Sequence, residues 1–138
     1  MHRWCNVMRL ERTFACPQEE LWRALTQPEV LSTWYDQMID YDTSRLDFAD
    51  GANLMFVAKD AHLFAAQHGR VTRIDPPHLL EYTRASQILR WELAAAGDGA
   101  SRLVLTVVAD QQASVIAGAP QLRAALDRLE TTLTGVAD

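Results

Sequence analysis

The clearest pattern in this chain is a stripe of leucines near its C-terminal end. The stripe recurs at steps of four, three and four residues, and its members are Leu122, Leu126, Leu129 and Leu133. These steps place the leucines on one face of a helix. We predict that this helix spans Pro120–Leu133, because proline suits the first helical position, where its missing N–H costs nothing. An apolar face of this length must be buried against another element.

A different pattern, the alternation of apolar and polar residues, runs through the middle of the chain. Alternation with a period of two is typical of strands that bury one face in a sheet. On this pattern Leu80, Tyr82 and Arg84 share one face, and turn-forming residues separate one alternating segment from the next. The predicted strands are Asn53–Lys59, Ala65–Ile74, His78–Arg84, Gln87–Ala94 and Arg102–Asp110.

The N-terminal part combines one strand with two short helices. Val7–Phe14 alternates and is predicted to be a strand. A helix over Pro17–Leu25 follows, since its acidic first turn suits the helix dipole, and a second helix spans Pro28–Trp34. The acidic segment Asp36–Asp50 is predicted to be a solvated loop, although the alternation of Arg45–Ala49 is consistent with a further strand.

The predicted order is a strand, two short helices, five or six hairpin-linked strands and one long helix. Helices that are kept apart from a run of strands indicate an antiparallel α+β domain with the long helix on one face of the sheet. A chain of 138 residues is expected to form a single domain, with its organised part over about 7–135.

Composition and charge narrow the range of partners. The formal net charge of −5 and the pI of about 5.3 argue against nucleic acid or an anionic membrane as the main partner. No apolar run reaches the roughly 18 residues of a membrane span, and the N-terminus lacks the apolar core of a signal peptide. We therefore expect a cytoplasmic protein, in which Cys5 and Cys16, which form no CxxC pair, are reduced.

No strong catalytic or metal-binding motif occurs in the chain. The histidines His2, His62, His68 and His78 have no metal-ligand spacing. Nucleophile-elbow, phosphate-loop and HExxH motifs are absent as well. We therefore expect no metal and no cofactor and assign no catalytic residue, while acid–base pairs that meet only in space remain an open alternative.

A series of short motifs runs in order through most of the chain. They are Thr13-Phe14, Glu20–Thr26, Trp34-Tyr35, Gly69–Val71, Ile74–Pro77, Leu80–Thr83, Trp91–Leu93, Ser101–Thr106 and Leu126–Leu129. As an ordered set they resemble the START-like helix-grip (SRPBCC) proteins, and among these the activator of heat shock protein 90 ATPase homologue 1-like domain. The resemblance implies a curved antiparallel sheet of six to seven strands around the long C-terminal helix. It also implies two short helices after the first strand and a cavity between sheet and helix.

The resemblance leaves three classes of function open, because a fold does not by itself determine function. The leading hypothesis is non-catalytic binding of a small hydrophobic or amphipathic molecule in the cavity. The family name suggests a chaperone-associated protein-interaction module, and the fold also hosts enzymes of the polyketide cyclase or hydratase type. A monomer and a homodimer are both compatible with the sequence.

Arg84 is the most informative residue for choosing among these classes. If the helix covers the face that carries Leu80 and Tyr82, the Arg84 guanidinium points into an apolar cavity and needs a carboxylate or an anionic ligand. Otherwise Arg84 reaches solvent at the end of its strand. In the first case it is expected to anchor an acidic apolar ligand. The predicted cavity-lining residues are Trp34, Phe56, Leu80, Tyr82, Arg84, Trp91, Leu122 and Leu126.

Overall fold

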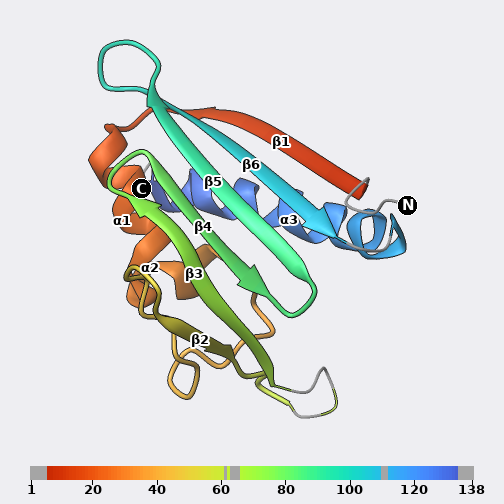
Figure 1. Ribbon diagram of the computed structural model, residues 1–138. Helices are drawn as coiled ribbons and strands as arrows, with labels where there is room; N and C mark the ends of the chain where they lie inside the picture. Colours follow the sequence, from red (N-terminus) through yellow and green to blue (C-terminus); the bar gives the residue numbers. More distant parts are fainter. Residues whose placement is uncertain (1–5, 61, 63–65, 110–111, 134–138) are drawn as a thin grey trace.

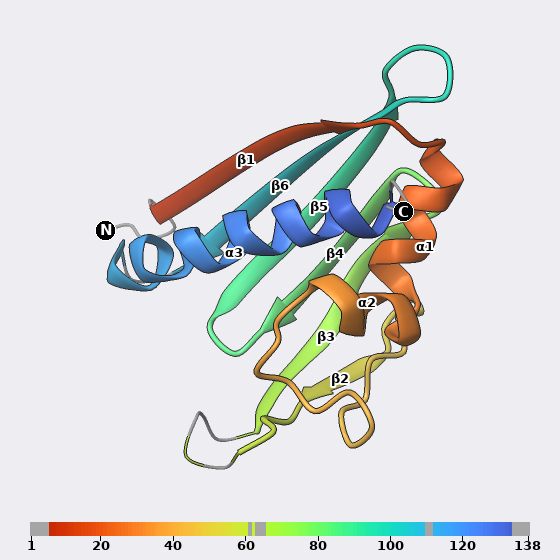
Figure 2. The same cartoon turned by 180° about the vertical axis from the view of Figure 1, so that it is seen from behind.

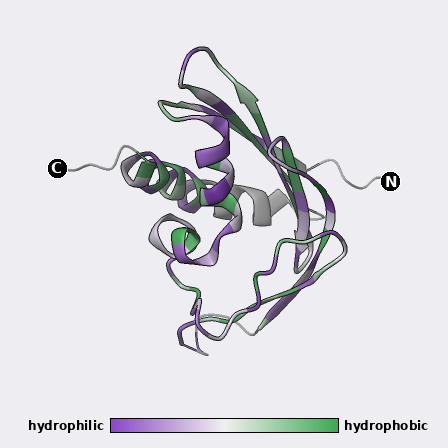
Figure 3. Ribbon diagram, turned by 90° about the vertical axis from the view of Figure 1, so that its left-hand side faces the viewer, coloured by the Kyte–Doolittle hydropathy of each residue, from purple (hydrophilic) through white to green (hydrophobic). Residues whose placement is uncertain are grey.

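Within residues 6–60, 62, 66–109 and 112–133, which the computed structural model describes, six antiparallel strands form one sheet with three helices on one side of it (Figures 1 and 2). The strands are ordered β1-β6-β5-β4-β3-β2 across the sheet. In chain order the elements are β1 (Asn6–Phe14), α1 (Gln18–Thr26), α2 (Pro28–Trp34), β2 (Asn53–Phe56), β3 (Gln67–Asp75), β4 (Leu79–Arg84), β5 (Gln87–Ala95), β6 (Ser101–Ala109) and α3 (Gln112–Leu133). Figure 3 shows the sheet as a curved wall beside the helices. This arrangement confirms the predicted α+β helix-grip fold.

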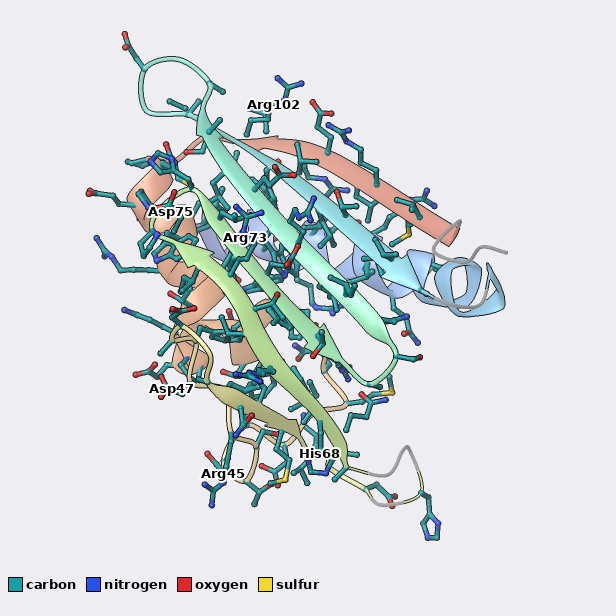
Figure 4. The ribbon with its side chains drawn as sticks, viewed as in Figure 1. Arg45, Asp47, His68, Arg73, Asp75 and Arg102 are labelled. Carbon is teal, nitrogen blue, oxygen red and sulfur yellow. The ribbon has the colours of Figure 1, made fainter. Side chains whose placement is uncertain are left out.

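Alternation along the strands separates a buried inner face from a charged outer face. Leu80 pairs with Trp91 across β4 and β5, Trp91 pairs with Leu105 across β5 and β6, and all three are buried. Figure 4 looks onto the outer face, where Arg73 and Arg102 are exposed. Because a slip of one residue would exchange the two faces, this burial confirms the predicted strand phase.

The helix α3 carries the leucine stripe along the inner face of the sheet (Figure 2). Its two central leucines, Leu126 and Leu129, are fully buried. The helix begins at Gln112, so the prediction that it begins at Pro120 was wrong. Proline removes one backbone hydrogen bond from a helix interior, and a helix of 22 residues retains the rest of its hydrogen-bond ladder. None of the helices in the described part of the chain is long and apolar enough to cross a membrane.

The acidic segment between α2 and β2 is irregular. Two isolated backbone bridges, Ile39–Ala58 and Arg45–Met55, connect it to the β2 side of the sheet. The strand suggested by the alternation of Arg45–Ala49 does not form, because Arg45 alone pairs and backbone hydrogen bonds in the residues that follow close a turn.

The aromatic core is centred where α2 meets the sheet. Trp34 is completely buried, and its indole Nε1–H donates to the carbonyl of Ala24 at 2.9 Å. The Trp34 ring packs edge-on against Trp91 of β5, with 5.8 Å between the ring centroids. A buried tryptophan with its N–H satisfied is held in one orientation. This packing fixes the end of α2 and therefore positions the residues that follow it.

Candidate functional site

A pocket of about 570 Å³ lies between the inner face of the sheet, the end of α2 and the helix α3. Its apolar wall comes from β1, β5, β6 and α3 and includes Met8, Leu89, Val107, Leu122 and Ala125. Its polar wall includes Tyr35, Asp36, Gln67, Arg84, Gln87 and Arg128. The volume falls in the range of small-molecule sites, about 300–1,000 Å³, and the mixture of an apolar wall with a few polar groups is typical of them.

The end of α2 places two residues on the pocket wall. Tyr35 leaves the helix with an extended backbone, and Asp36 follows it. Arg128 of α3 closes this helix end: its Nε donates to the Trp34 carbonyl at 3.0 Å and a terminal nitrogen donates to the Tyr35 carbonyl at 3.3 Å. The last carbonyls of a helix have no partner within the helix, so a cationic donor is favourable there. The same contacts tie α2 to α3 beside the pocket.

Arg84 points inward from the end of β4, and the protein supplies its counter-charge. A terminal nitrogen of Arg84 lies 2.8 Å from Oδ2 of Asp36, and Nε donates to Oε1 of Gln67 at 2.8 Å. The other terminal nitrogen donates to the Tyr35 hydroxyl at 3.3 Å, and the guanidinium lies 4.6 Å from the centre of the Phe56 ring. Burial alone would lower the pKa of Arg84, but Tyr35 and Asp36 raise it above its ordinary value. The guanidinium therefore stays charged.

A chain of hydrogen bonds connects the aromatic core to the pocket wall. The indole Nε1–H of Trp91 donates to the Tyr82 hydroxyl at 3.3 Å, which in turn donates to the Tyr35 hydroxyl at 3.3 Å. The Tyr35 oxygen thus accepts from both Tyr82 and Arg84. Burial, reinforced by Tyr35, raises the pKa of Tyr82 well above its ordinary value of 10. Tyr82 is therefore a fixed, protonated donor.

The structure places the eight predicted lining residues in two environments. Arg84 and Leu122 lie on the pocket wall. The other six are packed in the core, namely Trp34, Phe56, Leu80, Tyr82, Trp91 and Leu126. The six lie between the sheet and the helices, in the same core as buried residues such as Leu21, Leu31 and Ile39. Their burial therefore does not distinguish them from residues that only pack the core. A part for the six in ligand binding stays a prediction.

Of the polar residues on the pocket wall, the sequence had singled out Arg84, but not its charged and aromatic neighbours Tyr35, Asp36 and Arg128. Asp36 belongs to the segment predicted to be a solvated loop, yet it pairs with Arg84, which is 48 residues away. Tyr35 was part of the Trp34-Tyr35 motif, and this was the one signal pointing to it. Arg128 flanks the leucine stripe, a position at which a charged residue ordinarily faces solvent.

The histidines and cysteines form no site in the part of the chain that the structure describes. His62, His68 and His78 are exposed, and His2 and Cys5 lie outside the described residues. Cys16 is buried, and both burial and the nearby Glu20 raise the pKa of its thiol. Among the described residues, no group of three potential ligands is placed to hold a metal ion.

Comparison with protein families gives a match over most of the chain. The family model described as "Activator of Hsp90 ATPase homolog 1-like protein" matches residues 15–134 of the 138. Among curated proteins, none matches significantly.

Several solved structures are similar to this chain along almost their whole length. A protein from Rhodobacter sphaeroides superposes with a TM-score of 0.78 at 21% identity, covering 96% of this chain and 94% of that one. A protein from Mesorhizobium loti superposes with a TM-score of 0.77 at 20% identity, covering 96% of this chain and 99% of that one. An AHSA1 protein from Silicibacter pomeroyi gives 0.77 at 19% identity, with 93% and 97% covered. At these identities the likeness is one of fold.

Proposed function

Because this chain belongs to the activator of Hsp90 ATPase homolog 1-like family of START-like domains, we propose that it binds a small amphipathic molecule in the pocket beside α3. The observation that carries the proposal is the pocket itself, with its volume of about 570 Å³. Side chains from four elements form its apolar wall, so a ligand held there would be removed from water along most of its length.

The titratable groups at the pocket favour binding over catalysis. General acid–base catalysis needs a group whose pKa lies near the working pH. The pKa values of Arg84 on the pocket wall and of Tyr82 in the adjoining core are instead raised away from neutrality, so both side chains keep their protons. The carboxylate of Asp36 is held in its ion pair with Arg84. These groups suit the orientation of a ligand better than proton transfer in a cyclase or hydratase.

The outer surface gives less support to a protein-interaction module. Docking surfaces on proteins are commonly contiguous apolar patches of several hundred Å². Among the described residues, Val7 alone is a large apolar side chain with high exposure. One valine on an edge strand does not make such a patch.

A neutral fluorescent probe, N-phenyl-1-naphthylamine, tests the proposal. We expect its emission to rise on addition of the protein, because the probe would enter an apolar site. Ala124→Trp places a large side chain on the pocket wall of α3 and should weaken probe binding about tenfold or more.

The matched control is Arg123→Trp, which adds the same side chain at the neighbouring, exposed position of α3. It should leave probe binding unchanged. Equal binding by both variants, or no binding by the wild type, would mean that the pocket is not a binding site.

A further inference from the structure

Arg128 differs from the other arginines between α3 and the sheet in having no acidic partner. Arg12 is paired with Asp127, and Arg84 is paired with Asp36. Arg128, which is partly buried and lines the pocket, forms no ion pair with any described residue. Its hydrogen bonds to the carbonyls of Trp34 and Tyr35 use two of the five N–H donors of a guanidinium.

The charges on the pocket wall therefore do not cancel. Among the described lining residues, Asp36, Arg84 and Arg128 are charged, and Asp36 neutralises Arg84. One positive charge remains, at Arg128, in a protein whose net charge is −5. A partly desolvated cation without a counter-ion attracts an anion more strongly than an exposed cation does.

The Tyr35 hydroxyl is a second group on the same wall whose hydrogen-bonding capacity the described residues do not satisfy. Tyr35 is 3% exposed, and its oxygen accepts hydrogen bonds from Tyr82 and Arg84. Its own proton has no acceptor among the described residues. A buried donor without a partner carries a desolvation cost that an acceptor on a ligand would remove.

From these two features we infer that the ligand carries a carboxylate, held by Arg128, with a further hydrogen bond from the Tyr35 hydroxyl to a ligand oxygen. The inference rests on the proposed function and deepens it, since it names the ligand class as amphipathic carboxylic acids. The apolar body of the acid would lie along Met8, Leu89 and Val107. A guanidinium matches the planar carboxylate and can donate two hydrogen bonds to it.

Arg84 has a different role in this site. Its guanidinium already contacts Asp36, Gln67 and Tyr35. It is therefore a positioning residue, which donates a hydrogen bond to the Tyr35 oxygen and so helps to hold Tyr35 on the pocket wall. One of the two alternatives for Arg84 in the sequence was a ligand anchor, and the inference here gives that role to Arg128 instead.

Three ligands of equal chain length and different charge test the inference: octanoate, octan-1-ol and octylammonium. Each is titrated at pH 7.5 into the full chain pre-loaded with N-phenyl-1-naphthylamine, and binding is also followed by calorimetry. We expect octanoate to bind about tenfold or more tightly than the other two, which is the usual size of a hydrogen bond to a charged group.

Substitutions at position 128 identify the anchor. Arg128→Met keeps the length of the side chain and removes its charge, so it should lower the ratio of octanoate affinity to octan-1-ol affinity to about that of two uncharged ligands. Arg128→Lys should keep part of the preference. Arg123→Met is the matched control, since Arg123 lies on the same helix and is exposed, and it should behave as the wild type.

The outcomes separate this inference from the proposed function. If octan-1-ol or octylammonium binds as tightly as octanoate, or if Arg128→Met keeps the preference, the carboxylate site is wrong and the pocket stands. If none of the three displaces a bound probe, the carboxylate site is likewise wrong. The pocket itself is overturned only by the probe experiment, through no binding by the wild type or equal binding by Ala124→Trp and Arg123→Trp. If circular dichroism shows that Arg128→Met does not fold, the preference of the wild type for octanoate over octan-1-ol and octylammonium decides whether the carboxylate site is right.

Discussion

Arg84 and Asp36 form an ion pair at the polar wall of the pocket, and each charge is stabilised by the other. The side chains of Arg84 and Asp36 are 14% and 16% exposed, and their closest atoms are 2.8 Å apart. Removing one member of such a pair leaves the other charged and largely desolvated, which costs more than the pair itself gains.

We expect Asp36→Asn to lower the free energy of unfolding by about 3 kcal/mol, measured by urea denaturation. Arg84→Met should have a similar effect, and the double variant should lose less than the sum of the two single variants. Glu11→Gln is the comparison, because the Arg102–Glu11 pair on the outer face is largely exposed and should contribute less than about 1 kcal/mol. Strict additivity at Asp36 and Arg84 would contradict the coupling.

At Gly69 there is no room for a side chain between β3 and β4. This glycine pairs with Arg84, so it lies beside the residue that organises the polar wall. A Cβ atom built on Gly69 would lie 1.8 Å from the carbonyl oxygen of Thr83. That oxygen belongs to the backbone and can move only if the two strands separate.

Gly69→Ala is therefore expected to destabilise the protein by about 2 kcal/mol or more, measured as a lower midpoint of urea denaturation. Gly99→Ala makes the same chemical change in a turn, where φ is +68° and a Cβ would meet nothing within 4 Å. It should show only the cost of a left-handed backbone, about 1–2 kcal/mol. If the Gly69 variant is as stable as the wild type, the two strands are not packed this closely.

Tertiary contacts, rather than its own sequence preferences, hold the short helix α2 in place. α2 has only seven residues, too few to be stable alone, and Arg128 of α3 caps its last carbonyls. This contact means that α2, α3 and the pocket form one structural unit, so a ligand at Arg128 would also stabilise the junction of the two helices.

At the scale of the whole molecule, polar and charged side chains on the outer face of the sheet connect neighbouring strands. Glu81 of β4 is 8% exposed, accepts a hydrogen bond from Thr72 of β3 at 2.8 Å and pairs with Arg90 of β5 at 2.7 Å. Burial raises the pKa of this carboxyl, but the hydrogen bonds from Thr72 and Arg90 and the charges of Arg90 and Arg73 outweigh it. The net pKa lies below its ordinary value of 4.5.

A carboxyl whose pKa is lowered by folding stabilises the folded state above its unfolded pKa. This contribution is lost as the pH falls below about 4.5 and through the folded pKa, where the carboxyl takes up a proton. We therefore expect Glu81→Gln to be less stable than the wild type at pH 7, by a margin that narrows below pH 4.5 in denaturant titrations. Glu92→Gln, at an exposed position of β5, should differ little from the wild type in its free energy of unfolding at every pH. If the stability difference between Glu81→Gln and the wild type stays constant down to pH 3, the Glu81 carboxyl is not the source of this pH dependence.

The sequence alone determined the faces of the sheet and the class of the fold. Alternation places Leu80, Tyr82 and Arg84 on one side because successive side chains of a strand point to opposite faces, and this rule needs no tertiary contact. The leucine stripe likewise identified the buried face of α3. The N-terminal end of that helix was misplaced, because the helix-breaking tendency of Pro120 is a local preference that the rest of a long helix can override.

Only the tertiary structure decided which of the inward residues pack as core and which line a pocket. Trp34 and Trp91 meet because α2 folds onto β5, and no local pattern encodes that contact. The partner of Arg84 could not be read from the chain, since many acidic residues were available and Asp36 lies 48 positions away. Arg128 reaches back 94 positions to the end of α2. Alternation and helical periodicity report the direction of a side chain relative to its own backbone, whereas a pocket depends on distances between elements, which are set only when the whole chain packs.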